Sequence, residues 1–537
     1  MTTITVESVG RSPVRRIADL AVPWWRASWP SLAVATAGLG TYLVLTLARW
    51  HRQDAPSLDL AIFEQAVKGY AHFGPPTVDL KGPGVNQLGD HFSPVLALLA
   101  PFYRLFPSPV TLLVAQCVLV ALSIIPVTNA ARRFLGTWQG VCLGAAYALS
   151  WGLQNGVDVQ FHEYAFAVPM LAFALAAALT GHWRSAAWWA AALLTVKEDL
   201  GLTVIAFGSV MAVQGWLRHR RQAAAPTVPD TALASPVAQD SGDRAESRHP
   251  GSPQMTALKP SESGDPSGPL AECRAGLVLA AIGLAAMVLV FTVIIPALRA
   301  DGWYYWDKLG ASGAPGLGLI VGLLDPPVKL GTLLMVSAVV LGVCWFSPWG
   351  LVALPTLAWR FASTDPAHWG TAWHYSMILM PVVFLAAVDA LRRWRASRRR
   401  WVRALVPTAT VASLVFALVA TASFPLANLF KPATYRAPER ADQAEQVLDA
   451  IESGASVASD RGLVTRLATT RTVYWLGDYP EQVQPDYVLI DPLSGWQSDP
   501  GAAETYAEAI YGGRYEPVSG IGQPGDPSAY RLARRVP

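Results

Sequence analysis

Long stretches without a charged residue limit most strongly what this chain can fold into. Residues 105–131 and 275–298 contain no charged side chain. A helix needs about 20 apolar residues to cross the hydrocarbon core of a bilayer. Only 15% of the 537 residues are charged and 52% are hydrophobic, whereas soluble proteins carry about 25% charged residues. The sequence therefore predicts an α-helical membrane protein that crosses the bilayer many times.

The uncharged stretches predict about 11 transmembrane helices. The stretch 185–196 is short for a span, and the stretch 330–359 is too long for one, so Ser347-Pro348 is taken as a turn within it. Two short spans, 330–346 and 349–364, result, and Arg360 is expected to extend from the second toward the membrane surface. The other spans are predicted over 27–48, 105–131, 134–157, 164–183, 200–217, 275–298, 366–388 and 404–430.

The basic residues predict the orientation in the cytoplasmic (plasma) membrane. With a cytoplasmic N-terminus, eleven spans place the clusters of arginine inside, including the dense run from Arg392 to Arg403, as the positive-inside rule requires. The C-terminus then lies outside. The predicted regions are a cytoplasmic N-terminus (1–26), spans one to six (27–218) with a large first outer loop (49–104), a disordered cytoplasmic linker (219–273), spans seven to eleven (274–430) and an extracytoplasmic α/β domain (431–537).

Smaller features fill in this organisation and exclude some functions. Strands are expected at 456–458, 472–476 and 487–490, with a helix at 461–469, and the apolar piece 92–103 is expected to be re-entrant or interfacial. A net charge of +3 gives no electrostatic support for a nucleic-acid partner. The 4 cysteines show neither a disulfide framework nor metal-site spacing.

Acidic residues and histidines collect in the predicted outer loops. Asp59 could act as a general base at the mouth of a cavity, or it could simply stabilise a helix N-terminus. In a helix, Glu64 is displaced from Asp59 by about 140°, so the two carboxylates should not face each other. Asp90 and His91 could orient a substrate or bind a divalent cation, and Asp90 could equally cap a helix.

Two further clusters carry candidate chemistry. Asp158, His162 and Glu163 are candidate ligands for a divalent cation, but the adjacency of the last two makes joint coordination awkward, and no metal site is assigned. Lys197-Glu198-Asp199 follows a helix of only about 18 Å, so this triplet is expected within the bundle. It is either an internal ion pair or a lysine facing an anionic group such as a lipid phosphate. The aromatic segment 301–306 is either an interfacial belt or a sugar-stacking surface.

Several of these residues occur in motifs that resemble those of a large family of bacterial multipass membrane proteins of unknown function. The matching segments are Asp59-Leu60-Ala61-Ile62-Phe63-Glu64-Gln65 ("DLGIFDQ"), Leu88-Gly89-Asp90-His91-Phe92-Ser93-Pro94 ("LGDHFSP"), Phe161-His162-Glu163 ("FHE"), Lys197-Glu198-Asp199-Leu200-Gly201 ("KEDLG") and His374-Tyr375. The first segment departs from its motif at two positions, because Ala61 replaces the usual glycine and Glu64 replaces the usual aspartate.

The family looks distantly related to the GT-C glycosyltransferases, which take sugars from polyprenyl-phosphate carriers on the outer face of the membrane. The resemblance implies that Asp59 is the catalytic carboxylate, that Lys197 with His91 stabilises the departing lipid phosphate, and that the acceptor is a cell-envelope glycan. No cofactor is implied with certainty, although a divalent cation could take part. The residues expected to bind substrate are Gln65, Asp90, His91, His162, Glu163, Lys197, Glu198, Asp199 and His374.

Two other classes of function remain open. A transporter or lipid flippase would predict repeated halves and polar groups near the midplane on broken helices, and no internal repeat is recognisable. A non-catalytic scaffold or sensor would be built around the outer α/β domain.

Overall fold

Six helices are long and apolar enough to cross a membrane in the computed structural model, which describes residues 13–54, 57–224, 268–299, 305, 308, 322–521 and 526–537. Local sequence explains where such helices begin. The Ser108 hydroxyl accepts a hydrogen bond from the amide of Val110, and Pro109 occupies the first turn, where no amide partner is needed. The six candidate spans are Ser28–His51, Pro109–Leu135, Leu200–Ala223, Gly268–Leu298, His374–Arg395 and Arg400–Thr421.

The other five predicted spans correspond to shorter or broken helices. The stretch 134–157 divides into α5 (Thr137–Ala148) and α6 (Trp151–Asp158). Each of the remaining four predicted spans contains one shorter helix. These helices are α7 (Tyr164–Leu179), α8 (Trp183–Ala192), α13 (Pro327–Ala338) and α14 (Leu354–Ala362). The long helices carry the labels α1 (Pro13–His51), α4 (Pro109–Leu135), α9 (Leu200–Ala223), α10 (Gly268–Leu289), α11 (Ile295–Leu298), α15 (Leu379–Arg395) and α16 (Arg400–Thr421).

Helices extend into two regions that were predicted to lie outside the transmembrane spans. Helix α1 begins at Pro13, within the predicted cytoplasmic N-terminus, and α9 and α10 enter both ends of the predicted linker 219–273. The prediction of disorder was therefore wrong at the ends of this linker, and residues 225–267 lie outside the described residues. The aromatic segment 301–306 also lies outside them, apart from Tyr305.

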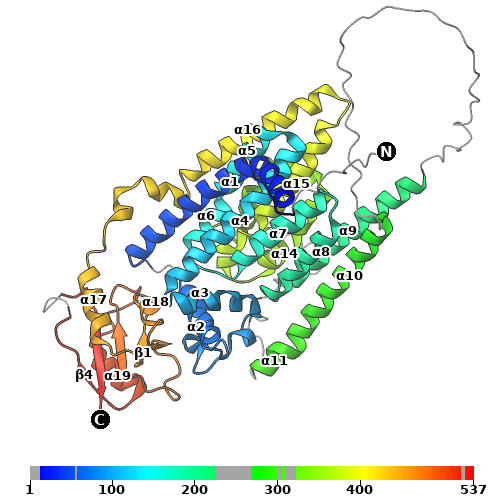
Figure 1. Ribbon diagram of the computed structural model, residues 1–537. Helices are drawn as coiled ribbons and strands as arrows, with labels where there is room; N and C mark the ends of the chain where they lie inside the picture. Colours follow the sequence, from blue (N-terminus) through cyan, green and yellow to red (C-terminus); the bar gives the residue numbers. More distant parts are fainter. Residues whose placement is uncertain are drawn as a thin grey trace, which may run out of the picture.

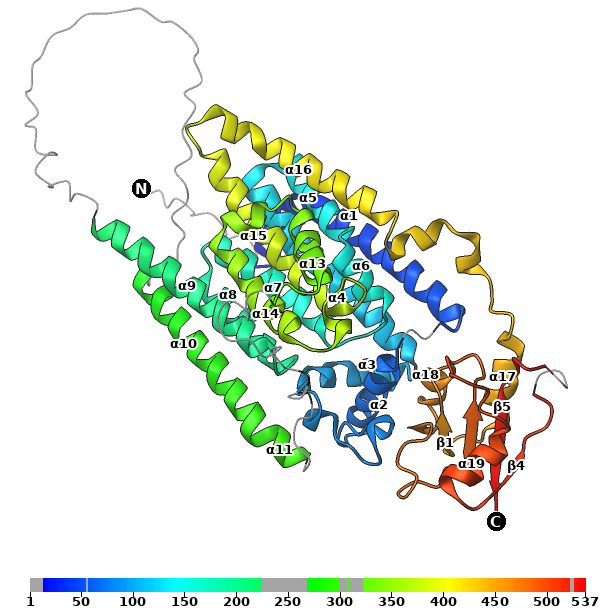
Figure 2. The same cartoon turned by 180° about the vertical axis from the view of Figure 1, so that it is seen from behind.

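The bundle has two distinct ends (Figures 1 and 2). The turn between α15 and α16 and the last turn of α9 lie at one end, and both are rich in arginine. The end of α1, helix α11 and the C-terminal domain lie at the opposite end. The basic clusters are thus separated from the C-terminal domain by the length of the bundle.

The first loop, between α1 and α4, packs against the end of the bundle that carries the C-terminal domain. The apolar piece predicted as re-entrant or interfacial forms η3 (Pro94–Leu99) and α3 (Ala100–Leu105). One face is buried, including Tyr103, whereas Leu98 and Phe102 on the other face are each 60% exposed. The loop also contains α2 (Asp59–Ala71), η1 (Asp79–Lys81) and η2 (Gln87–Gly89).

The C-terminal domain contains one five-stranded sheet with the strand order β2-β1-β3-β5-β4. Strand β1 pairs in parallel with β2 and β3, whereas β5 is antiparallel to β3 and β4. The first three strands occur where the sequence predicted them, and α17, α19 and the last two strands were not predicted. The elements are α17 (Ala441–Ala450), β1 (Ser456–Ser459), α18 (Val464–Leu467), β2 (Thr472–Trp475), β3 (Tyr487–Ile490), α19 (Ala503–Tyr511), β4 (Arg514–Pro517) and β5 (Arg531–Val536).

Candidate active site

A cavity of about 530 Å³ collects most of the polar residues that the sequence singled out. It is bounded by the start of α2, by the loops that precede α7, α9 and α15, and by α10. Breaks between short helices bring these loops together at the end of the bundle where α2 lies. The predicted site residues that line it are Asp59, His91, His162, Glu163, Lys197, Glu198, Asp199 and His374.

Asp59 and two histidines form one side of the cavity. The Asp59 Oδ2 atom lies 3.0 Å from His162 Nε2, and the Asp59 side chain is 38% exposed. The His162 ring stacks on His374 with 3.6 Å between centroids. Burial alone would raise the pKa of Asp59, but the charge and hydrogen bond of His162 outweigh burial and hold the pKa well below its usual range. Asp59 is therefore an ionised carboxylate facing the cavity.

Lys197 and its neighbours form another part of the wall. Lys197 Nζ donates to Glu163 Oε1 at 2.7 Å and lies 4.8 Å above the Tyr164 ring. Burial would lower the pKa of Lys197, but the surrounding carboxylates of Glu163, Glu198 and Asp199 raise it above the usual value. Asp199 accepts a hydrogen bond from the Tyr164 hydroxyl, and burial raises its pKa to about 6. The lysine is thus a charged group held by Glu163 from a neighbouring loop and by the two acids that follow it in the sequence.

His91 and Asp90 each have a partner that is far away in the sequence, and Asp90 has a nearer one as well. His91 Nδ1 lies 2.8 Å from Glu198 Oε1, and the same carboxylate accepts the amide of Phe92. Asp90 is fully buried behind the lining and pairs with Lys81 and with Arg299, the latter at 3.0 Å. Burial opposes ionisation of Asp90, but the charges of His91, Lys81 and Arg299 lower its pKa to about 2. Asp90 therefore positions Lys81, which lines the cavity.

Buried polar atoms without a protein partner gather around this cavity. Both ring nitrogens of His374, the Glu163 Oε2 atom and the Asp199 Oδ1 atom have no hydrogen-bond partner among the described residues. The same holds for the side-chain amide of Gln87, which lines the cavity and is fully buried. Since buried polar groups are nearly always hydrogen-bonded in folded proteins, these atoms are available to hydrogen-bond water or a polar ligand in the cavity.

Gln65 and Asp158 lie outside the lining. Gln65 donates to the carbonyl of Val473 in the C-terminal domain and accepts the amide of Leu80. Asp158 pairs with Arg49 at the end of α1. The three candidate metal ligands therefore point to different partners, and no group of three or more His, Cys, Asp or Glu side chains in the described part of the chain is arranged to hold a metal ion.

The structure adds lining residues that sequence reasoning did not select. Gln87, Lys81, Lys308 and His368 line the cavity, and Lys308 pairs with Asp365 at 3.2 Å. For Lys81 and Gln87 the sequence carries no signal beyond their position in the first loop. The histidine was visible in an outer loop but had no motif around it.

The expectation for Arg360 was wrong. Its side chain is fully buried and does not extend to a membrane surface. It donates to the carbonyls of His368 and Gly370 and to the Ser376 hydroxyl. These bonds tie together the two ends of the loop between α14 and α15, which is how His368 and His374 are held beside the cavity.

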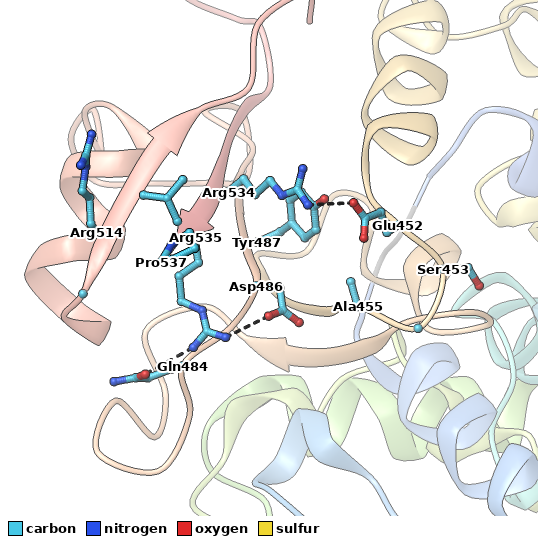
Figure 3. A pocket seen from close by; sticks show the side chains of 13 residues that line it. Glu452, Ser453, Ala455, Gln484, Asp486, Tyr487, Arg514, Arg534, Arg535 and Pro537 are labelled. Carbon is cyan, nitrogen blue, oxygen red and sulfur yellow. Dashed lines mark hydrogen bonds and ion pairs between the residues drawn. The ribbon is translucent and has the colours of Figure 1, made fainter.

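A larger cavity of about 690 Å³ lies in the C-terminal domain, where β1 and β3 begin (Figure 3). Four of its charged side chains form two ion pairs: Arg534 pairs with Glu452 at 2.9 Å and Arg535 with Asp486 at 3.1 Å. These four side chains are between 37% and 66% exposed. Exposed pairs of this kind contribute little energy. None of the described residues that line this cavity has a buried polar side-chain atom without a partner.

The sequence pattern of the predicted membrane protein family DUF2079 matches residues 54–521. The chain belongs to this family. A comparison with curated proteins finds no match. Membership of this predicted membrane protein family agrees with the six candidate spans and with the membrane protein that the uncharged stretches predicted.

Two solved structures of ArnT have a fold similar to that of this chain. ArnT from Cupriavidus metallidurans, bound to undecaprenyl phosphate, is 12% identical with a TM-score of 0.52, over 94% of this chain and 97% of ArnT. ArnT in the apo state gives the same identity and TM-score over 96% and 98% of the two chains. The apo oligosaccharyltransferase of Archaeoglobus fulgidus is 11% identical with a TM-score of 0.42, over 90% and 71%. The likeness to ArnT shows that this DUF2079 protein has a GT-C-like fold.

Proposed function

We propose that this DUF2079 protein is a membrane glycosyltransferase that uses a polyprenyl-phosphate-linked sugar as donor. The observation that carries the proposal is the cavity in which Asp59, Lys197 and unpartnered buried polar atoms face one space. A sugar offers many hydroxyls to such atoms, and a lipid phosphate offers a charge to the lysine. The ArnT fold supports the same class of donor, since one ArnT structure holds undecaprenyl phosphate.

The proposed reaction is an inverting transfer. The acceptor hydroxyl oxygen forms a bond to the anomeric carbon, the bond from that carbon to the phosphate oxygen breaks, and its electron pair stays with the lipid phosphate. The hydroxyl proton passes to the Asp59 carboxylate. Because the hydroxyl becomes acidic only as the new bond forms, a carboxylate of low pKa can still accept its proton late in the step. His162, 3.0 Å from Asp59, orients the carboxylate.

The cations of the cavity are proposed to stabilise the leaving phosphate. Lys197 and His91 face the cavity, and Lys81 and Lys308 add positive charge to the same wall. Fixed cations in a partly desolvated site stabilise developing negative charge more strongly than they would in water. Glu198 fixes His91, and Glu163 fixes Lys197, so both donors are pre-oriented.

The proposed orientation places this chemistry outside the cytoplasmic membrane. Eleven crossings, counting the short and broken helices as spans, put the arginine-rich end in the cytoplasm, as the positive-inside rule favours. The cavity and the C-terminal domain then face outward, where a cell-envelope glycan is available as acceptor.

The test combines transfer and donor binding. Asp59→Asn is expected to abolish restoration of the altered glycan in a strain that lacks the gene, while the purified variant still binds undecaprenyl phosphate in nanodiscs. Asp54→Asn is the matched control, because Asp54 pairs with Arg49 and does not line the cavity. Full glycan restoration by Asp59→Asn would refute the role of Asp59 as base.

The rival functions predict different outcomes. A transporter would move a lipid-linked sugar across vesicles without forming a new glycosidic bond. A non-catalytic scaffold would tolerate alanine at Asp59, Asp90 and Lys197 without loss of the cellular phenotype.

A further inference from the structure

Helix α2 presents different residues on its two faces. Asp59, Ile62 and Phe63 line the cavity. Glu64 and Lys68 are about 140° and 180° from Asp59 around the helix axis and face the C-terminal domain. The same short helix therefore carries the candidate base on one side and a domain contact on the other.

The contact with the C-terminal domain is polar, buried and specific. The Glu64 Oε1 atom accepts hydrogen bonds from the Thr469 hydroxyl at 2.6 Å and from the Tyr103 hydroxyl at 2.8 Å. Gln65 and Lys68 donate to backbone carbonyls of the domain, at Val473 and Ala468. Glu64 is fully buried and Gln65 is 7% exposed.

The opposite face of α2 is joined to the cavity wall with equal specificity. Phe63 contacts the rings of Phe161 and His162 at centroid distances of 5.5 and 5.8 Å. Asp59 meets His162 at 3.0 Å. A rotation or shift of α2 would therefore change the Asp59–His162 distance directly.

We infer that the C-terminal domain positions Asp59 through α2, and that Glu64 is the positioning residue at this contact. Glu64 does not touch the cavity, so it acts only through the helix that it holds. The inference rests on the proposed function only in taking Asp59 as the group that meets the acceptor.

The protonation state of Glu64 gives this role a measurable signature. Burial raises its pKa to about 7, although hydrogen bonds from Thr469 and Tyr103 and the charge of Lys68 oppose that rise. The titratable groups facing it are Tyr103 from α3 and Lys68 from α2 itself. The Glu64 Oε2 atom has no hydrogen-bond partner within the described residues, as suits a neutral carboxyl group better than a charged one. Docked protein then binds more protons than undocked protein above the usual glutamate pKa, so docking should weaken as the pH rises toward 7.

Hydrogen exchange of the full-length protein in nanodiscs tests the contact without an activity assay. Glu64→Ala is expected to speed amide exchange in α2 and β2 by about tenfold or more, because the hydroxyls of Thr469 and Tyr103 lose their acceptor. Thr469→Val, which removes one hydroxyl from the domain side, should produce a smaller change in the same segments. Glu452→Gln is the control, since Glu452 is exposed and pairs with Arg534 within the C-terminal domain.

The conservative variant separates positioning from a merely structural loss. Glu64→Gln keeps the acceptor oxygen and stays neutral at every pH. Near pH 5 the α2 amides of this variant should be as protected from hydrogen exchange as those of the wild type, and this protection should not fall by about pH 8. Wild-type protection, corrected for intrinsic exchange, should fall over that interval. Unchanged α2 exchange in both Glu64→Ala and Thr469→Val, or equal pH dependence in the wild type and Glu64→Gln, would overturn the inference.

Transfer assays distinguish failure of this inference from failure of the proposed function. Glu64→Ala should lower kcat while leaving the Kd for undecaprenyl phosphate unchanged, because Lys197 is not on α2. An unaltered kcat in a protein with loosened α2 would refute the positioning role. Absence of transfer in the wild type would refute the proposed function, and the exchange data would still decide whether the domain holds α2.

Discussion

At the residue scale, the cavity joins charges that are far apart in the sequence. Lys197 with Glu163 and His91 with Glu198 are pairs between different loops. The sequence identified each of these four residues because acidic residues and histidines cluster in the predicted outer loops. It could not identify their partners, because which loop packs on which depends on how the short helices break.

Removal of one charge from the Lys197–Glu163 pair should destabilise the fold. Lys197→Met leaves the Glu163 carboxylate buried without a cation and is expected to cost about 3 kcal/mol of unfolding free energy. The double variant Lys197→Met/Glu163→Gln should recover most of that loss but not the binding of undecaprenyl phosphate. Thermal unfolding in detergent and a lipid-binding assay measure the two effects, and equal instability of the single and double variants would contradict the explanation.

The pH dependence of transfer should depend on His162. Because the pKa of Asp59 lies below its usual range, the wild-type rate should not fall through Asp59 protonation until the pH drops below about 4. His162→Gln removes the neighbouring cation, so the pKa of Asp59 rises and the acid limb of the kcat profile moves to higher pH. His182→Gln, at the exposed turn before α8, is the control, and coincident acid limbs in all three proteins would exclude the effect.

At the element scale, the sequence located apolar helices well and their breaks poorly. Nothing in the stretch 134–157 marks the break after Ala148, because it contains neither proline nor charge. The structure supplies the reason in Gln154, which donates to the carbonyl of Leu149 and to the Thr421 hydroxyl and accepts the amide of Leu426. The helix break leaves the Leu149 carbonyl without a helical partner, and Gln154 supplies a hydrogen bond to it. Gln154 is held in place by Thr421 and Leu426, so the break depends on packing between segments that are far apart in the sequence.

Close packing of α9 on α10 gives a prediction at the same scale. A side chain at Gly208 would lie 2.6 Å from the carbonyl oxygen of Gly276, a distance that real contacts essentially never show. Gly208→Leu should therefore separate these helices and lower the stability by about 1–3 kcal/mol. Gly40→Leu on α1, where nothing lies within 4 Å of the added carbon, should have little effect on the apparent Tm. Similar Tm values for the two variants would refute this packing.

At the scale of the whole molecule, the sorting of charges along the chain predicted two unlike ends. The structure has these ends, with arginine-rich turns at one and the C-terminal domain at the other (Figure 1). The docking of this domain on α2 was not predictable, because Glu64, Gln65 and Lys68 resemble an ordinary polar helix face until the domain is present.

Labelling with a membrane-impermeant thiol reagent tests the proposed orientation. A cysteine at Ser453, which is exposed on the C-terminal domain, should react in intact cells. A cysteine at Ala396, between the arginines of the α15–α16 turn, should react only after the membrane is opened. The unsubstituted protein controls for reaction at its own cysteines, and labelling of Ala396→Cys in intact cells would reverse the topology.

The contact between the first loop and strand β2 also affects the solubility of the C-terminal domain. Strand β2 lies at the edge of the sheet, where Gln65 satisfies one of its carbonyls and η1 packs beside it. An uncovered edge strand offers its free backbone groups to any other strand. A C-terminal domain released from α2 would therefore tend to associate through β2 with other copies of itself. The contact that positions α2 thus also protects the domain against aggregation.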